Sequence, residues 1–418
     1  MSYPRTLAAR VLTRVLSDSQ PLDEAMAAIQ GEIKAQDRAW LQEICSGTIR
    51  WKGRLDQILD STSLKKKPTG WLRKMLLLTS YQLVAQDRAP VARVVSETVT
   101  EIKSKEGEAP ANFANAVLRK IGDHGKSWRT LGFPTTGTAK EAAQWASLPE
   151  WLWPKLVKAY GLEWAKAFAI ATLDRPTLWI RSKDEAKGIA GAELGSVPGS
   201  YRIVPTEDAQ MTPVPTWQGF ESGQFLVQDV SSQFLIHEVC KQAKQIFKAQ
   251  SEITALDLCA APGGKAIGMA WNGLKVYASD QAGPRFELLK QSVQRADQSI
   301  QLISPDKLSE LALVDLVWVD APCSGTGILR RHPDVRWLRK EKELASLHEV
   351  QLSLVRKGWD RLKPGGLLVY SVCSVLKEEG PELLEAAQLK GEKLQQWFLT
   401  PQEQPFGDGF WGGVIRKV

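Results

Sequence analysis

The hydrophobic positions of the chain change their period along the sequence. Over residues 4–125 apolar side chains recur every three or four positions, which predicts amphipathic helices. The apolar stripes are Leu7–Leu16, Leu41–Ile58, Leu72–Leu83 and Val91–Ile102. Proline, glycine and polar residues interrupt the pattern at Ser19–Pro21, Lys67–Gly70, Ala89–Pro90 and Glu106–Pro110. We therefore expect an all-α domain over residues 1–130.

A less regular region follows this helical domain. Gly132–Thr138 has the composition of a linker. Leu148–Tyr160 is rich in tryptophan and predicts a helix, whereas Thr177–Arg181 and Tyr201–Val204 predict short strands. We expect a small α+β module over residues 140–222.

From about Gly223 short apolar runs alternate with segments of helical period. The expected strands are Ile253–Leu258, Lys275–Ser279, Ile300–Ile303, Leu313–Val319, Leu367–Tyr370 and Gly413–Val418. The expected helices include Lys265–Trp271, Phe286–Ala296 and Leu344–Leu362. This alternation is typical of parallel strands joined by right-handed crossovers. Residues 223–418 are thus predicted to form an α/β domain with a doubly wound, Rossmann-like sheet.

The composition is that of a chain with two or three globular domains. It has 418 residues, of which 43% are hydrophobic and 24% charged, and a formal net charge of +7 that favours a polyanionic partner. It has neither an apolar run of membrane-spanning length nor a hydrophobic signal segment. Its five cysteines include no CxxC pair, which argues against a disulfide framework and a zinc site. We expect a reduced, cytoplasmic enzyme that uses no metal and no membrane and has no evident need to be more than a monomer.

A candidate cofactor loop follows the strand that ends near Leu258. Its residues are Cys259, Ala260, Ala261, Pro262, Gly263, Gly264 and Lys265. The two glycines permit a tight turn and a close approach of the backbone to a ligand. The loop matches neither the dinucleotide pattern GxGxxG nor the phosphate-binding pattern GxxxxGK[ST], which disfavours a nicotinamide dehydrogenase and ATP hydrolysis. Asp280 ends the next strand, where an acid can bind ribose hydroxyls, so we expect a ribose-bearing cofactor.

Two cysteines occupy equivalent places after other strands. Cys323 lies in the Pro- and Gly-rich segment Val319–Gly327, and Cys373 lies in Leu367–Ser374. Because the carboxyl ends of parallel strands meet at one rim of the sheet, both thiols should lie beside the glycine loop. A single cysteine is usually buried and inert, but two equivalent placements favour a chemical role. A thiolate can attack an electron-poor ring carbon, so the pattern suggests covalent catalysis on a nucleobase.

A basic segment comes directly after the first of these cysteines. Leu329–Lys340 contains Trp337 and the cations Arg330, Arg331, Arg336, Arg339 and Lys340. Cations for phosphates and a planar side chain for stacking suit single-stranded or splayed RNA, and the alternative is an ordinary basic surface helix. For the Lys and Arg residues of the N-terminal domain, RNA contact and a solvated surface both remain open.

Several of these segments resemble those of the RNA cytosine-5 methyltransferase superfamily, the NOL/NOP/Sun group. The matching stretches are Asp257–Lys265, Asp320–Asp334, Tyr370–Ser374, Val227–Ser232 and Asp408–Trp411. The N-terminal helices resemble the antitermination factor NusB. Those matches are Asp37–Arg38, Gly47–Arg50, Tyr81–Leu83, Pro90, Glu97–Thr98 and Asn115–Arg119. The combination is similar to that of bacterial small-subunit rRNA methyltransferases of the Sun type, and it covers nearly the whole chain, least well at about 126–220.

The resemblance implies S-adenosylmethionine as the methyl donor and small-subunit rRNA as the partner. It places the cofactor on Cys259–Lys265, with Asp280 on its ribose and Asp306 near its adenine. It places Asp320 near the methionine end of the cofactor or the target base.

The same resemblance assigns roles to the thiols. Cys373 adds to C6 of a cytosine that has left its stack, and Cys323 assists the later elimination. Three positions depart from the family pattern. Val372 replaces a usual Thr, Ile303–Asp306 replaces a Gly-Asp-Gly-type segment, and Lys377–Gly380 replaces Pro-Glu-Glu-Asn in a place that is not expected to touch the chemistry.

Other functions remain open on the sequence alone. A tRNA is the alternative substrate, although the NusB-like domain favours rRNA. A non-catalytic RNA-binding ribosome-assembly factor would explain the fold but not the two cysteines and the glycine loop. A DNA cytosine methyltransferase would use a nucleophile at the Cys323 position and leave Cys373 unexplained. The N-terminal domain is expected to bind either RNA or protein.

Overall fold

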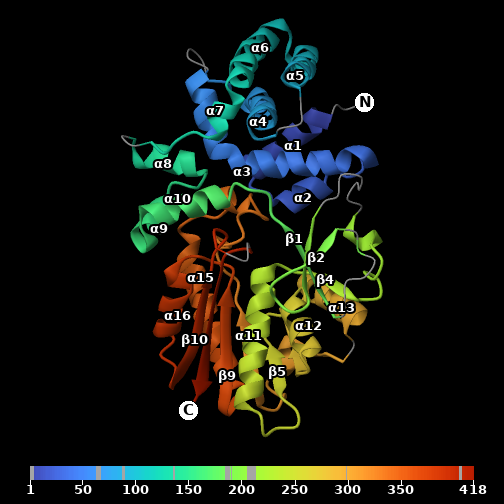
Figure 1. The fold of residues 1–418 in the computed structure, drawn as a ribbon, viewed down its shortest axis with the longest axis vertical. Coiled ribbons are helices and arrows are strands. Elements are labelled where there is room, and N and C mark those ends of the chain that lie inside the picture. The colour runs from blue at the N-terminus through green and yellow to red at the C-terminus, as the bar shows by residue number, and fades with distance from the viewer. Residues whose placement is uncertain are drawn as a thin grey trace. The chain divides into compact units, whose positions relative to one another are not determined.

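The chain folds into two compact units. The computed structural model describes residues 4–62, 67–86, 90–134, 137–183, 189, 191–204, 213–297, 299–403 and 407–418. The first unit comprises Met1–Arg175 and Leu329–Glu341, and the second comprises Pro176–Ile328 and Lys342–Val418 (Figure 1). Ala89 of one predicted break and residues 135–136 of the predicted linker lie outside the described residues.

The first unit is helical, as the spacing of apolar residues over 4–125 predicts. Its helices are α1 (Pro4–Leu16), α2 (Leu22–Ala27), η1 (Ala35–Asp37), α3 (Arg38–Thr62), α4 (Gly70–Ala85), α5 (Val91–Glu106), α6 (Glu108–Asp123), α7 (Gly125–Arg129), α8 (Ala139–Ala146), α9 (Leu152–Tyr160), α10 (Leu162–Ala171) and α14 (Val335–Leu338). The buried faces of α1 and α3–α6 form one hydrophobic core. Its members include Leu12, Ile44, Leu78, Ile102 and Leu118, each at most 1% exposed.

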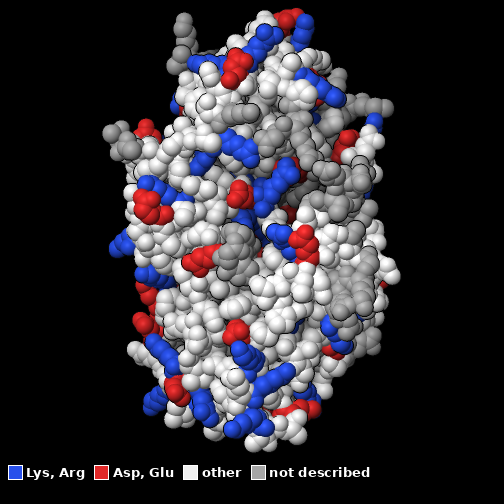
Figure 2. Space-filling view, viewed as in Figure 1, with Lys and Arg blue, Asp and Glu red and all other residues white. Residues whose placement is uncertain are grey.

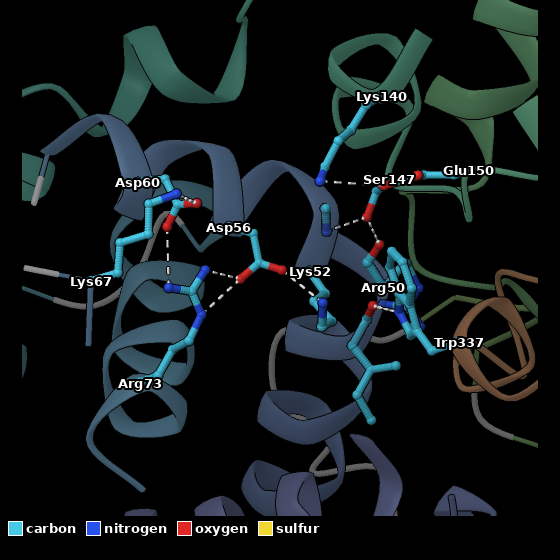
Figure 3. A network of polar contacts seen from close by, with 12 residues as sticks. Arg50, Lys52, Asp56, Asp60, Lys67, Arg73, Lys140, Ser147, Glu150 and Trp337 are labelled. Carbon is cyan, nitrogen blue, oxygen red and sulfur yellow. Dashed lines mark hydrogen bonds and ion pairs between the residues drawn. The ribbon is translucent and has the colours of Figure 1, made fainter. Parts of the chain in front are cut away.

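The expected middle module over residues 140–222 is divided between the two units. Its helices α8–α10 belong to the first unit and its strands to the second. The Ser147 hydroxyl at the end of α8 donates to Arg50 O and accepts from the Gly53 amide, both on α3 (Figure 3). The guanidinium of Arg54 lies 4.6 Å from the ring centre of Trp145. These polar and aromatic contacts attach the Trp-rich helices to α3, which the composition of the segment did not reveal.

The basic segment Leu329–Lys340 departs from its predicted role. Arg336 is 1% exposed, and its guanidinium donates to Ser147 O and Thr172 O, the C-caps of α8 and α10. Trp337 donates its indole N–H to Ile49 O of α3 (Figure 3). A cation is stabilised at helix C-termini, where backbone carbonyls lack helical partners. The prediction that Arg336 presents itself to RNA is therefore wrong, because its guanidinium is held inside the first unit. Trp337 is half-buried, and its indole N–H is already used within the same unit.

Many cations of the first unit are paired with carboxylates of the same unit. On α3 and α4, Asp56 binds Lys52 at 2.7 Å and Arg73 at 2.5 Å, and Asp60 binds Arg73 at 3.1 Å and Lys67 at 2.8 Å (Figure 3). Figure 2 shows cationic and anionic side chains interspersed on the visible face. No large field of one sign is therefore visible on this face.

The second unit is built on a seven-stranded sheet in the order β10-β11-β9-β8-β5-β6-β7. The strands are β5 (Thr254–Asp257), β6 (Lys275–Ala278), β7 (Gln301–Leu302), β8 (Val314–Asp320), β9 (Leu362–Val372), β10 (Gly391–Leu399) and β11 (Phe410–Lys417). Strands β5 to β9 pair in parallel, and β11 pairs antiparallel with both β9 and β10. The predicted α/β fold with a doubly wound sheet is confirmed. Strand β10 was not predicted, because it is a half-exposed strand with a register shift between Lys393 and Gln395 and little apolar alternation.

Helices and a smaller sheet complete the second unit. The helices are α11 (Val230–Ile246), α12 (Gly264–Trp271), α13 (Pro284–Ala296), α15 (Glu343–Asp360) and α16 (Pro381–Ala386). One core joins the large sheet to α11, α12 and α13, and another joins it to α15 and α16. The small sheet has the order β2-β3-β1-β4 and consists of β1 (Leu178–Ser182), β2 (Ala192–Leu194), β3 (Ser200–Ile203) and β4 (Phe225–Val227). Within the described residues, no helix has the length and apolar character needed to span a membrane.

Candidate active site

The glycine loop crosses the carboxyl ends of three neighbouring strands. The amide of Leu258 donates to Trp318 O of β8, and the amide of Ala260 donates to Ser279 O after β6, each at 2.9 Å. Gly263 has φ +115°, a left-handed conformation that favours glycine, and it is the N-cap of α12. A side chain on Gly264 would meet the Gln228 amide group, with Cβ only 2.9 Å from Nε2. The loop is therefore fixed against the sheet, and its last two residues, Gly264 and Lys265, form the N-terminus of α12.

Two acids lie next to this loop, one bonded to it and one two residues before it in the chain. Asp280 accepts hydrogen bonds from the amides of Ala261 and Gln281, both at 2.8 Å. Asp257, the last residue of β5, is fully buried, and no side chain of the described residues hydrogen-bonds to its carboxylate; only the backbone at Cys259 partly offsets the rise of its pKa. Burial, followed by the charge of Asp320, raises the pKa of Asp257 to about 7. Sequence reasoning quoted Asp257 only as part of a motif and missed its burial.

Lys265 and Asp320 form an ion pair at the end of β8. Lys265 Nζ lies 2.5 Å from Asp320 Oδ2, and Ser371 Oγ donates to Oδ1 at 2.7 Å. The Lys265 side chain is 10% exposed and the Asp320 side chain 31%. The ring centre of Phe410 lies 5.3 Å from Lys265 Nζ, which brings the Asp408–Trp411 stretch to the same site.

The two predicted thiols meet. Cys323 Sγ lies 3.3 Å from Cys373 Sγ, although 50 positions separate them. The backbone fixes this approach, because the Ala321 amide donates to Ser371 O and the Gly327 amide donates to Cys373 O, each at 3.0 Å. Hydrogen bonding to Cys373 and burial raise the pKa of the Cys323 thiol well above its usual range. Cys323 therefore carries its proton at neutral pH.

Two other predicted residues, Cys259 and Asp306, lie in very different surroundings: the first is nearly buried beside carboxylates and the second is exposed. Burial and the charges of nearby carboxylates raise the pKa of Cys259, so this thiol is not an activated nucleophile. Asp306 is exposed on η3 (Pro305–Lys307) and accepts a hydrogen bond from Ser304 at 2.6 Å. Within the described part of the chain, no hydrogen bond or ion pair connects Asp306 to the glycine loop or to either thiol. The structure thus brings together the loop, Asp280, Asp320 and both thiols, but not Asp306.

A buried carboxylate that the sequence did not mark as functional also reaches this site. Glu379 on η4 (Lys377–Glu379) is 1% exposed and accepts hydrogen bonds from Ser324 and Ser374, the residues that follow the two thiols. Lys377–Gly380 was expected not to touch the chemistry directly, and Glu379 indeed bonds to the neighbours of the thiols rather than to the thiols themselves. No group of three or more His, Cys, Asp or Glu in the described residues is arranged to hold a metal ion.

Comparisons with known proteins agree with this geometry. Residues 244–408 match the family described as 16S rRNA methyltransferase RsmB/F, and residues 2–123 match the NusB family. A ribosomal RNA small subunit methyltransferase B from Vibrio cholerae is 30% identical over 99% of this chain and 97% of that protein. The protein of the same name from Cronobacter sakazakii is 31% identical over 99% of this chain and 98% of that protein.

Solved structures show the same fold. The crystal structure of PH0851 superimposes with a TM-score of 0.70 at 20% identity and covers 100% of this chain and 99% of that one. A methyltransferase homologue from Pyrococcus horikoshii gives a TM-score of 0.53 at 21% identity, covering 66% of this chain and 97% of that one. Because its sequence matches these relatives over nearly their whole length, the chain belongs to the RsmB family of S-adenosylmethionine-dependent ribosomal RNA methyltransferases, with a NusB-family domain at its N-terminus.

Proposed function

We propose that the protein methylates C5 of a cytosine in small-subunit rRNA through a covalent adduct with Cys373. The observation that carries this proposal is the 3.3 Å separation of the Cys323 and Cys373 sulfurs at the rim that also holds the glycine loop. Two thiols in contact suit a reaction in which one sulfur bonds to the base and the other handles a proton. The printed names of the relatives supply the small-subunit rRNA part of the proposal.

The glycine loop and Asp280 fit S-adenosylmethionine. The backbone of Cys259–Lys265 turns through a left-handed glycine, and its two glycines carry no side chain that would hold a ligand away from the backbone. Asp280 accepts one backbone amide on each carboxylate oxygen, and Arg285 Nε lies 3.6 Å from its Oδ1. A carboxylate has about four acceptor positions, so capacity for ribose hydroxyls remains. The bound cofactor supplies an electrophilic methyl group. Asp306 is exposed and bonds to Ser304 rather than to the loop, so its contact with the adenine stays a prediction.

Cys373 performs the covalent step in this proposal. Its thiolate adds to C6, forming an S–C6 bond and moving electron density to C5, which can then take the methyl group. Loss of the C5 proton and cleavage of the S–C6 bond restore the aromatic ring and the thiolate. Asp320 and Lys265 stand at the same rim as an acceptor and a cation that can orient the target base.

The surroundings of Cys323 suit it to accept the C5 proton after methyl transfer. The hydrogen bond to Cys373 and the negative charge of the Cys373 thiolate are among the causes that raise the pKa of Cys323. Both causes disappear once the Cys373 sulfur is bound to C6. Cys323 then releases its proton to solvent water more readily, and the resulting thiolate takes the C5 proton as the S–C6 bond breaks, which leaves Cys323 as a thiol and Cys373 as a thiolate.

Methyl transfer from labelled S-adenosylmethionine to unmethylated small-subunit rRNA tests this function. The wild type and Cys373→Ala are compared, and the product base is identified after digestion. 5-Methylcytosine formed by the wild type alone supports both the reaction and the nucleophile. Transfer to tRNA but not to rRNA would keep the mechanism and replace the substrate. Cofactor binding without transfer to any RNA would favour a ribosome-assembly factor.

A further inference from the structure

A single buried carboxylate joins the two chain segments that carry the thiols. Glu379 Oε1 accepts from the Ser324 amide at 2.8 Å and from Gln351 Nε2 at 3.0 Å. Glu379 Oε2 accepts from Ser324 Oγ at 2.5 Å and from Ser374 Oγ at 2.6 Å. Ser324 follows Cys323, and Ser374 follows Cys373. Each thiol is thus one residue away from a hydrogen bond to the same side chain.

The connection is reinforced on both sides. Gln351 Nε2 also donates to Pro322 O, directly before Cys323, at 2.9 Å. Tyr370 of β9 donates its hydroxyl to the backbone oxygen of Glu379 at 2.7 Å, which ties η4 to the strand that leads to Cys373. Ser374 Oγ also lies 2.9 Å from Thr326 Oγ1.

The electrostatics of Glu379 are unusual for a structural side chain. It is 1% exposed, and none of its hydrogen-bond donors in the described chain is a Lys or Arg side chain. A buried anion without a cationic partner is costly unless hydrogen bonds satisfy it, and here four donors do so. An apolar side chain would fill the same space without that cost, so the position calls for a carboxylate rather than for volume alone.

We propose that Glu379 is a positioning residue for the two-thiol reaction, because its carboxylate fixes the distance between the Cys323 and Cys373 sulfurs. This role rests on the proposed function, but the spacing itself can be measured without methyl transfer. The carboxylate also adds negative charge near Cys323, which helps that thiol to keep its proton while Cys373 attacks.

Oxidative closure of the two thiols measures their spacing directly. A diazenedicarboxamide oxidant takes two electrons and two protons from Cys323 and Cys373, is reduced to its hydrazine form, and leaves a disulfide that peptide mass spectrometry detects. We expect rapid closure in the wild type. Glu379→Gln keeps the volume but puts an amide N–H₂ where the carboxylate accepted, so closure should slow by about tenfold or more.

Kinetics on RNA test the consequence for catalysis. Glu379→Gln should lower kcat by about 10- to 100-fold while KM for RNA and the affinity for S-adenosylmethionine stay within about twofold of wild type. Glu379→Asp, which keeps the charge but shortens the reach, should give intermediate values in both assays. Glu382→Gln on α16 is the matched control, because Glu382 is exposed, and it should behave as wild type in both.

The outcomes separate this proposal from the proposed function. If Glu379→Gln forms the disulfide at the wild-type rate and keeps the wild-type kcat, the positioning role is overturned. A wild type that closes the disulfide in a Glu379-dependent manner but methylates no RNA would overturn the proposed function and leave the spacing role in place. If Glu379→Gln does not fold, Ser374→Ala removes one hydrogen bond on the Cys373 side and should slow closure; an unchanged rate there would contradict the proposal.

Discussion

Lys265 and Asp320 form an ion pair that holds a cation in place between the glycine loop and the end of β8. The pair spans 2.5 Å, and its carboxylate is held from the other side by Ser371, whose hydroxyl accepts from the indole N–H of Trp318 at 2.9 Å. The chain Trp318–Ser371–Asp320–Lys265 thus connects the core of the sheet to its reactive rim. Because the Lys265 side chain is 10% exposed, removal of its partner would leave a poorly solvated charge.

Asp320→Asn should therefore impair both stability and activity. We expect a loss of about 1–3 kcal/mol in the free energy of unfolding, at the lower end because Asp320 is 31% exposed, and a fall in kcat/KM of at least about 100-fold. Urea denaturation and steady-state methyl transfer measure the two effects. With Lys265→Met, a double-mutant cycle should give a coupling of about 0.5–3 kcal/mol.

The pair formed by Lys363 and Asp315 provides the control for this experiment. Both residues lie near the start of their strands, β8 and β9, at the end of the sheet away from the reactive rim, and Lys363 Nζ is 2.8 Å from Asp315 Oδ1. Lys363→Met should leave kcat/KM within about twofold of wild type. Strict additivity of the Lys265 and Asp320 variants would show that the rim pair is not a coupled unit.

Substitution of the two cysteines should have different effects on the reaction. Cys373→Ala should abolish methyl transfer, because the sulfur that bonds to C6 is gone. Cys323→Ala should accumulate a covalent protein–RNA adduct, because the sulfur that assists elimination is missing. Denaturing gel electrophoresis with labelled RNA detects the adduct. An adduct in Cys373→Ala, or none in Cys323→Ala, would contradict these roles.

The buried carboxyl of Asp257 should make the stability of the protein depend on pH. Its pKa is raised to about 7, so the folded protein binds this proton more tightly than the unfolded chain does. Its contribution is fully present below the unfolded pKa of about 4, and it is lost as the pH rises towards 7. Asp257→Asn should remove this slope and, at pH 8, raise the free energy of unfolding relative to wild type by at most roughly 4 kcal/mol.

Urea denaturation at pH 5 and pH 8 measures that slope for the wild type and the Asn variant. The difference in unfolding free energy between the two proteins should be larger at pH 8 than at pH 5. An equal difference at both values would mean that Asp257 titrates in its ordinary range.

Sequence periodicity was sufficient for the N-terminal helices, for the parallel part of the large sheet and for the meeting of the two thiols, because these depend on local patterns and on the rule that parallel strands end at one rim. It did not show strand β10 or the division of the middle module between the two units. It was insufficient where a contact joins distant segments. Glu379 lies in a short polar stretch, and only the folded chain brings it to Ser324, 55 positions away. The basic run at Leu329–Lys340 has the composition of an RNA-binding surface, and composition alone does not show that Arg336 meets two helix C-termini.

Substitution of Arg336 tests whether this side chain stabilises the first unit or contacts RNA. Arg336→Met leaves Ser147 O and Thr172 O without their donor, so we expect a loss of about 2–4 kcal/mol in the stability of the first unit. Arg336→Lys should rescue little, because an ammonium group cannot reproduce the planar fork that reaches both carbonyls. Arg356→Met on α15 is the matched control, because Arg356 is exposed, and it should change stability by less than about 0.5 kcal/mol.

RNA binding by the same variants decides between the structural role of Arg336 and the RNA contact that its sequence suggested. A side chain that contacts phosphate contributes to the dependence of binding on salt, and its removal lowers the slope of log K against log salt concentration by about 1. Because Arg336 is 1% exposed, the folded Arg336→Lys and Arg336→Met proteins should keep the wild-type slope. A slope reduced by about 1 in folded protein would mean that Arg336 leaves its two carbonyls to bind RNA.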